Sequence, residues 1–276
     1  MSNAHVPRIH PTAVISPEAE IADDVVVGPY VIVEGAVRIG AGCVLRPHVV
    51  LCGPLTIGER NMVFSGAVLG ERPQHSHYKD EPTRVEIGDD NIFRENVTVH
   101  RGTTQSWATR IGSQNFFMAN AHVAHDCQIG SRCMLANGAL LGGHCVIADN
   151  VFLSGNAAIH QYCRVGRLAF LSGLSATTKD IPPFIIQQRI DVVMGVNVIG
   201  MRRAGISRDQ IDAVRRAYQI IYRQGNLVPV ALAEVERQMG HLAAVAELVG
   251  FIRQSKRGIN AARLDHDQGN DREMAA

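Results

Sequence analysis

Aliphatic residues recur at every sixth position along most of the chain up to residue 171. Counted from Ile9, the first residue of each six-residue block is Ile, Leu, Val or Phe over residues 9–69, 87–99 and 111–171. Self-similarity at a period of six is the sequence signature of a parallel β-helix, in which tight turns join short strands. The pattern therefore predicts an all-β coil for this part of the chain.

The fifth position of each block is mostly small or slender, and it supplies a second inward-facing residue. Side chains two apart on a strand share a face, so position five and the next position one both point into the coil. Asn61, Asn91 and Asn115 are the polar exceptions, and we expect each to bond the backbone at a corner. Glycine is frequent at position two, where we expect it to supply turn conformations.

Five of the six cysteines occupy the fifth position, which predicts packing rather than reactivity. A thiol in apolar surroundings stays protonated and inert. The cysteines form no C-x-x-C pair that would indicate a zinc ribbon or a redox motif. We therefore expect a buried ladder of free thiols at Cys43, Cys127, Cys133, Cys145 and Cys163.

The hexad pattern divides the chain into parts. Residues 71–86 and 100–110 are polar interruptions, and they predict loops that leave the coil, where function is often carried. The hexads end near Pro182 and Pro183, which cannot continue a strand ladder. Helical spacing follows and opens with a capping box, Ser207 and Gln210. We predict a coil at 1–182, a helical domain at 183–258 and a disordered tail at 259–276.

Charge and hydropathy exclude several classes of protein. The formal net charge is +1, which implies no general attraction to nucleic acid or to a membrane surface. No apolar run is long enough to span a bilayer, and the first ten residues lack a secretory pattern, so we expect a cytoplasmic protein without membrane insertion. Residues 183–263 carry twelve Arg or Lys against six Asp or Glu. This excess is either a solvated helical face or a docking surface for an acidic partner.

Several motifs resemble one known family. They are EPTRVEIGDDN, TVHRGT, NAHVAHDCQIG, HQYCRVG, DIPPF, GVN and AVRRAYQIIYRQG, spread over roughly residues 9–258. The chain resembles the acyl-carrier-protein-dependent UDP-N-acetylglucosamine O-acyltransferases, which catalyse the first step of lipid A biosynthesis. The resemblance implies a left-handed parallel β-helix of three hexads per turn with a C-terminal α-helical domain. It also implies a homotrimer with sites between subunits, no cofactor, no metal, and acyl carrier protein and a nucleotide sugar as partners.

The resemblance also assigns roles to individual residues. It implies that His125 is a general base, that Asp126 orients it, and that the Gly143 N–H faces the thioester oxygen. It implies substrate contacts at His122, His144, His160 and Gln161 and at the loop residues Gln74, His75 and His77. It implies nucleotide contacts at Asn197 and Arg203, and an acyl-length limit at Gly173.

The stacking that the resemblance implies gathers the histidines on one side of the coil. Residues 18 apart then lie one above the other, which aligns His125, Gly143 and Gln161 and places His144 over Asp126. All of these fall at positions that face out of the coil. Histidine has an unperturbed pKa of about 6.5, so it can take a proton from a sugar hydroxyl near neutral pH. The alternative is an ordinary polar interface between subunits.

The chain departs from the family pattern in its substrate loops. An acid and a lysine are replaced by His75 and His77, the run after DIPPF differs at residues 189–191, and Ile199 stands for a glutamate. These changes favour, as an alternative, a paralogue that acylates a different nucleotide sugar or a sugar amine. A zinc hydrase and a non-catalytic binding protein remain further alternatives. The hydrase lacks its usual histidine five residues before His122, because position 117 is Phe.

Overall fold

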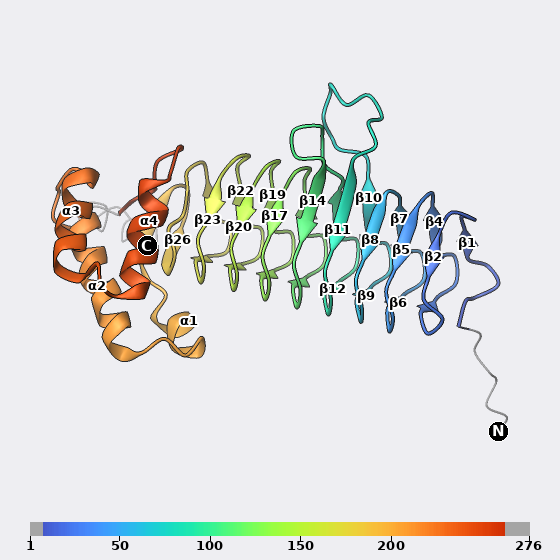
Figure 1. The fold of residues 1–276 in the computed structure, drawn as a ribbon, viewed down its shortest axis with the longest axis horizontal. Helices are drawn as coiled ribbons and strands as arrows, with labels where there is room; N and C mark the ends of the chain where they lie inside the picture. The colour runs from blue at the N-terminus through green and yellow to red at the C-terminus, as the bar shows by residue number, and fades with distance from the viewer. Residues whose placement is uncertain (1–7, 263–276) are drawn as a thin grey trace, which may run out of the picture.

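The computed structural model describes residues 8–262, which form a long three-sided coil followed by a group of helices (Figure 1). Every turn of the coil contributes one short strand to each of three parallel sheets. We number the sheets in the order in which the chain first enters them. The first sheet contains β1 (Val14–Ile15), β4 (Ile32–Glu34), β7 (Val50–Cys52), β10 (Val68–Glu71), β13 (Thr98–His100), β16 (His122–Val123), β19 (Leu140–Leu141), β22 (Ala158–Ile159) and β25 (Ala176–Thr177).

The second and third sheets repeat the same stacking. The second contains β2 (Glu20–Ile21), β5 (Val37–Ile39), β8 (Leu55–Ile57), β11 (Arg84–Ile87), β14 (Ala108–Ile111), β17 (Gln128–Ile129), β20 (Val146–Ile147) and β23 (Arg164–Val165). The third contains β3 (Val26–Val27), β6 (Val44–Leu45), β9 (Met62–Val63), β12 (Ile92–Phe93), β15 (Phe116–Phe117), β18 (Met134–Leu135), β21 (Phe152–Leu153), β24 (Phe170–Leu171), β26 (Ile185–Gln188), β27 (Val192–Val196) and β28 (Ala261–Ala262).

The strand register confirms the stacking of residues 18 apart. Val14 pairs with Ile32, and His122 pairs with Leu140. Around the two interruptions the pairing interval lengthens, so that Val68 pairs with Thr98 and Thr98 with His122. The coil thus continues across both insertions, because each loop leaves and re-enters at the same corner, between the first and second sheets. Both loops project there beside β10, β11 and β14 (Figure 1).

The interior of the coil is packed by positions one and five, as the hexads predict. Leu51, Leu69 and Leu135 are fully buried at position one. All six cysteines are free and buried, which confirms the predicted ladder of five thiols. Cys52 is buried outside this ladder, with its thiol beside Glu71. Burial raises the pKa of Cys133 and of Cys163 to about 12, so these thiols stay protonated near neutral pH.

Glycine at position two has a different role from the predicted one. A Cβ on Gly40 would lie 2.6 Å from the carbonyl oxygen of Gly58, so glycine permits neighbouring turns to approach closely. Left-handed backbone occurs instead at position four, where residues such as Asp126 (φ 63°) and His144 (φ 60°) form the corners. Asp and His enter this region more readily than most non-glycine residues.

The corner between the second and third sheets carries the three asparagines, and we call it the asparagine corner. Asn91 donates from its backbone N–H and its Nδ2 to Asn61 Oδ1, over 2.9 and 3.0 Å. Its Nδ2 also reaches the Gly112 carbonyl at 3.0 Å, while its own Oδ1 accepts from Asn115 N–H at 2.9 Å. The predicted bonding of these side chains to the corner backbone is confirmed. The side chains also bond one another from turn to turn, which forms a ladder.

The outward-facing residues differ between the three sheets. Apolar side chains predominate on the first sheet, such as Val14 and Leu140, and on the third sheet, such as Met134. The second sheet presents charges, including Arg38 paired with Glu20 at 2.9 Å and Arg110 paired with Glu86 at 2.7 Å. Two faces of the coil are therefore suited to packing and one to water.

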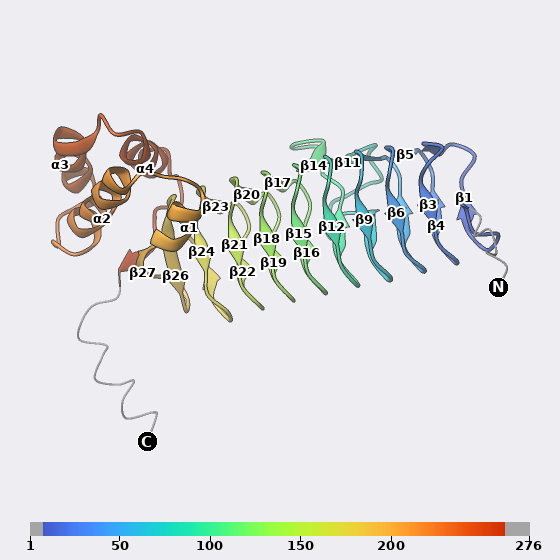
Figure 2. The ribbon, with the colours of Figure 1, turned by 90° about the horizontal axis from the view of Figure 1, so that it is seen from below.

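The C-terminal region begins with sheet rather than helix. β26 continues the third sheet in parallel with β24, so strands extend beyond the boundary we predicted at 182, and β27 turns back antiparallel. The helices α1 (Val198–Arg203), α2 (Arg208–Tyr222), α3 (Val228–Met239) and α4 (Ala243–Arg253) follow at the end of the coil away from the N-terminus (Figure 2). β28 then pairs with β27, so the first residues of the predicted tail belong to the sheet. Residues 263–276 lie outside the described residues.

The predicted capping box at the start of α2 is wrong. Ser207 occupies the N-cap position, but its side chain makes no capping hydrogen bond. Gln210 instead accepts a 2.9 Å hydrogen bond from the backbone N–H of Ala244, which joins α2 to α4. Within the described part of the chain, none of the helices is both long enough and apolar enough to traverse a bilayer.

Candidate active site

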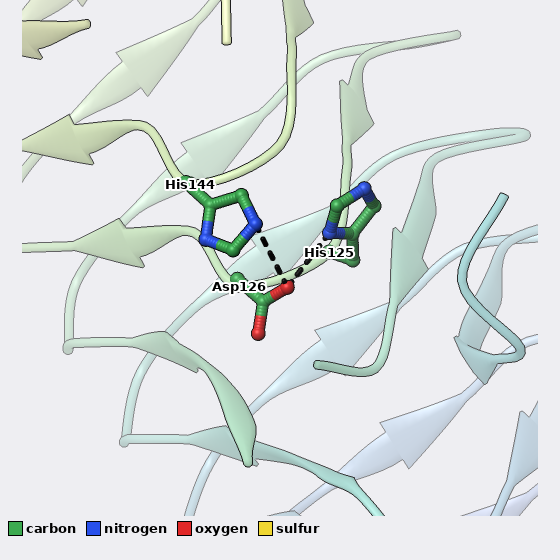
Figure 3. Close-up of side chains that lie close together, drawn as sticks. All are labelled: His125, Asp126 and His144. Carbon is green, nitrogen blue, oxygen red and sulfur yellow. Dashed lines mark hydrogen bonds and ion pairs between the residues drawn. The ribbon is translucent and has the colours of Figure 1, made fainter. Parts of the chain in front are cut away.

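The centre of the site is a histidine–aspartate pair at the corner between the first and second sheets, which we call the histidine corner. His125 and Asp126 lie in the turn that joins β16 to β17. His125 Nδ1 is 2.7 Å from Asp126 Oδ2 (Figure 3). His125 is 9% exposed and Asp126 is 3% exposed, although both lie outside the core of the coil. They are covered because the second inserted loop folds over this corner.

Asp126 accepts a full set of hydrogen bonds from that loop. Thr103 donates from its backbone N–H and its hydroxyl, both at 2.8 Å, and the Ser106 hydroxyl is a further donor. Burial would raise the pKa of Asp126, but the hydrogen bonds from His125, Ser106 and Thr103 outweigh burial and hold its pKa well below the ordinary value. Asp126 is therefore a carboxylate at neutral pH.

This carboxylate fixes the orientation of the His125 ring. An ionised Asp126 can only accept, so the Nδ1 of His125 carries a proton, and in the neutral ring Nε2 is then the nitrogen with the lone pair. Nε2 points away from the carboxylate (Figure 3). The geometry matches that of a general base whose partner orients the imidazole and stabilises the imidazolium formed on proton transfer.

The next turn of the coil brings Gly143 and His144 to the same corner. A Cβ on Gly143 would lie only 2.6 Å from His125 Cε1, so glycine leaves room for the ring. His144 Nε2 is 3.4 Å from Asp126 Oδ2, and its ring meets that of His125 edge to face at 5.2 Å. Burial lowers the pKa of His144, and His125 and His75 add to this effect against the opposing pull of Asp126.

The following turn holds His160, Gln161 and Tyr162. His160 and Gln161 are exposed, and His160 Nδ1 lies 3.4 Å from Arg257 Nη2. Tyr162 stacks on His144 with ring centres 4.4 Å apart and planes nearly parallel. The sequence reasoning missed Tyr162, although the same spacing of 18 that aligned the histidines places it directly beyond His144.

The first inserted loop brings one of its two histidines to the base. The His75 ring meets the His125 ring edge to face at 5.3 Å, and His77 lies 5.7 Å from His75. His75, His77 and Gln74 are all exposed. The structure therefore joins His75 to the centre of the site, while Gln74 is exposed on the same loop.

A second group of imidazoles adjoins this centre. His122 Nδ1 lies 2.7 Å from the Thr98 hydroxyl, and its ring is 5.0 Å from that of His100. Burial, together with the neighbouring His122, lowers the pKa of His100 to about 4. His100 stands in the quoted motif TVHRGT, but neither periodicity nor spacing had marked it as a site residue.

Three predicted site residues lie elsewhere on the same chain. Gly173 is exposed at the corner between the third and first sheets. Asn197 and Arg203 line a cavity of about 370 Å³ over the third sheet, together with Phe152, Phe170 and Ile199. Asn197 caps α1 by accepting from Gly200 N–H at 2.9 Å and donates to the Leu168 carbonyl at 2.8 Å. Within one chain these residues do not meet His125.

The fold and the site define a class of protein. A carboxylate-oriented imidazole, set on a hexapeptide coil whose cysteines are all buried, is equipped to activate a hydroxyl. The bacterial transferase hexapeptide family model matches residues 18–53 and 108–143. The coil is a left-handed parallel β-helix with a C-terminal helical region, and its class is that of the hexapeptide-repeat transferases.

The comparisons then narrow the class to one family. A family model described as UDP-N-acetylglucosamine O-acyltransferase, domain 2, matches residues 180–260. Acyl-[acyl-carrier-protein]–UDP-N-acetylglucosamine O-acyltransferases from Halorhodospira halophila and an Anaeromyxobacter species are 43% and 46% identical, each over 91% of this chain and 98% of the relative. The crystal structure of a UDP-N-acetylglucosamine acyltransferase from Bacteroides fragilis superposes with a TM-score of 0.89 at 40% identity, over 91% of this chain and 99% of that one. The chain belongs to this family of acyltransferase enzymes.

Proposed function

We propose that the chain transfers a 3-hydroxyacyl group from acyl carrier protein to the 3-hydroxyl of UDP-N-acetylglucosamine, the first step of lipid A biosynthesis. The observation that carries the proposal is the buried pair of His125 and Asp126, 2.7 Å apart and packed against Gly143. The names of its relatives supply the substrates. We place the reaction in the cytoplasm, as the sequence led us to expect.

The proposed reaction needs no covalent enzyme intermediate. His125 Nε2 takes the proton from the sugar hydroxyl as its oxygen attacks the thioester carbonyl, and Asp126 stabilises the resulting imidazolium. The Gly143 N–H, which makes no hydrogen bond within residues 8–262, donates to the developing oxyanion. Collapse of the tetrahedral intermediate breaks the carbon–sulfur bond, and His125 returns its proton to the leaving thiolate.

The outward faces of the coil support a homotrimer as part of the proposal. The first and third sheets present apolar side chains such as Leu140 and Phe152, whereas the second presents ion pairs. Packing the first sheet of one subunit against the third of the next closes a ring about a threefold axis and leaves the charged sheet in water. The same packing would bring Asn197 and Arg203 of one subunit toward the histidine corner of its neighbour.

A basic cleft beside the site supports an acidic donor protein. The cleft, of about 630 Å³, is lined by Tyr162, Arg164, Asp180, Gln254, Lys256 and Arg257. Tyr162 connects it to His144 through the ring stack. Positive side chains at the mouth of a site attract an acidic partner and raise its rate of association.

The test is a mass-spectrometric screen of nucleotide sugars with 3-hydroxyacyl carrier proteins of several chain lengths. The expected product is an ester of UDP-N-acetylglucosamine that mild alkali cleaves. The 3-amino analogue is the matched acceptor, because its amide product would resist the same treatment. Turnover of the amine alone would favour the alternative function, a paralogue that acylates a sugar amine. The exposed residues His75, His77 and Ile199 are the reason for considering that alternative. Absence of any acylated product would overturn the proposal.

A further inference from the structure

The histidine corner has the composition of a transition-metal site as well as that of a base. His125, Asp126 and His144 each offer a ligand atom, and these atoms lie within 4.8 Å of one another. The His75 ring adds a further imidazole, 5.3 Å from His125. With bonds of about 2.0–2.1 Å, two imidazoles on one tetrahedral zinc ion stand with ring centres about 5 Å apart. The observed separation of 5.2 Å between the His125 and His144 rings matches that geometry, whereas His75 must shift to bring a ring nitrogen to the same ion.

We propose that His125, Asp126 and His144, completed by His75 from the first inserted loop, bind one divalent ion of the zinc class and that this ion inhibits the enzyme reversibly. The metal takes the place of the proton between His125 Nδ1 and Asp126 Oδ2, and that proton passes to solvent. The inhibitory part rests on the proposed function. The binding part does not, because it needs only the side chains of the histidine corner and of His75.

The surroundings of the corner favour a metal of this class. Two or three imidazole nitrogens with one carboxylate oxygen suit Zn²⁺, Co²⁺ or Ni²⁺, whereas Mg²⁺ and Ca²⁺ prefer oxygen ligands alone. Thr103 and Ser106 already hold Asp126 in place through hydrogen bonds, as outer residues commonly do around metal ligands. His75 lies on an exposed loop, so it can adjust to complete the coordination.

Loss of function follows from the identity of the ligands. An ion on His125 and Asp126 removes the hydrogen bond that orients the base. His75 and its neighbour His77 add imidazole beside this corner. The first inserted loop therefore contributes to the metal sensitivity that we propose.

The experiment measures binding first and activity second. Co²⁺ is titrated into the full-length, chelator-treated protein, and its visible absorption bands report imidazole coordination. We expect one Co²⁺ per chain, displacement by Zn²⁺ and no displacement by Mg²⁺. His144→Gln and His75→Gln should weaken binding at least about tenfold. His48→Gln is the matched control, since His48 stacks on Tyr30 and lies far along the sequence from the corner, and it should bind as the parent does.

The outcomes separate the two proposals. Binding that is equal in His144→Gln and the parent, or that His48→Gln abolishes, overturns the metal site. His75→Gln keeps the test sharp if His144→Gln fails to fold, because His75 is exposed on a loop. Zn²⁺ should inhibit acyl transfer at the concentration that fills the site, and a chelator should restore it. Stoichiometric binding to a protein that has no acyltransferase activity would overturn the proposed function and leave the site standing.

Discussion

The histidine corner and the asparagine corner both stack polar side chains on successive turns, and they differ in how those side chains are satisfied. In the asparagine corner, Asn61, Asn91 and Asn115 bond one another and the backbone of adjacent turns. In the histidine corner, Asp126 is saturated, but the Nε2 of His125 points away from its partner. The asparagine corner, where the side chains bond one another, stabilises the coil. The histidine corner leaves the Nε2 of His125 free to react.

The difference arises from the loops. Both insertions leave the coil at the histidine corner, and one of them supplies the Thr103 and Ser106 donors that bury Asp126. The asparagine corner has no insertion in the described coil, and its donors and acceptors come from the repeat itself. The repeating hexads thus provide the stabilising hydrogen bonds, and the inserted loops provide the surroundings of the reactive histidine.

The largest expected effect is on catalysis by His125. His125→Ala removes the proposed base and should lower kcat/KM for acyl transfer by about 10²–10⁴-fold. Thermal unfolding should change little by comparison, because no hydrogen bond of the strands depends on this ring. His48→Ala, on an earlier turn and at a different corner, between the third and first sheets, should retain full activity. Turnover in His125→Ala equal to that of the parent would remove the base from the mechanism.

Gly143→Ala tests how much the histidine corner depends on the space that glycine leaves for the His125 ring. The new Cβ would lie 2.6 Å from His125 Cε1, so the ring must move, and a displacement near 1 Å can cost about 100-fold in rate. Gly155→Ala is the matched control: it has the same hexad position, but the nearest atom to its Cβ is 3.7 Å away. Steady-state kinetics should show a large loss for the first variant and none for the second. Equal rates for the two would contradict the packing argument.

Asn91→Ala tests how much the asparagine corner contributes to stability. The substitution leaves the Asn115 N–H and the Gly112 carbonyl without partners in a buried position, at a cost of about 2–3 kcal/mol in the free energy of unfolding. Denaturant titration measures this loss, and kcat should stay near that of the parent. Asn226→Ala, at an exposed site, should leave stability unchanged. Unaltered stability in Asn91→Ala would show that the ladder contributes nothing.

The smallest effect is a pH dependence confined to the histidine corner. The pKa of His100 is about 4 in the folded protein, below the ordinary value near 6.5. The unfolded chain therefore binds the proton first, and the free energy of unfolding falls as pH drops from 6.5 toward 4. The loss from this residue is about 2 kcal/mol between pH 7 and pH 5. His100→Asn should flatten the pH profile of unfolding, while Asn91→Ala should shift it without changing its slope.

The sequence predicts the repeating parts of the molecule better than its interruptions. Each hexad carries its own signal of position, so the coil, the buried thiols and the Asn ladder all follow from periodicity. The stacking of His125, Gly143 and His144 follows from the same spacing, once the number of residues per turn is known. Tyr162 was within reach of this reasoning and was missed.

The donors to Asp126 could not be predicted in this way. Thr103 and Ser106 lie in a loop whose path depends on tertiary contacts and has no period. The capping box failed for a related reason, because Gln210 finds a partner in α4 that local sequence does not reveal. The same limit applies to the boundary at 182, since β26 joins the third sheet after a turn that contains two prolines.

Both insertions begin and end at a single vertex of the prism, which has a consequence for how such a protein can change. The ladder above and below that vertex resumes in step whatever the length of the excursion, so neither insertion has to fit the scaffold along its whole path. Substitutions such as His75 and His77 can accumulate there without disturbing the interior. Related proteins can therefore differ in the ligand they bind while they keep the same coil.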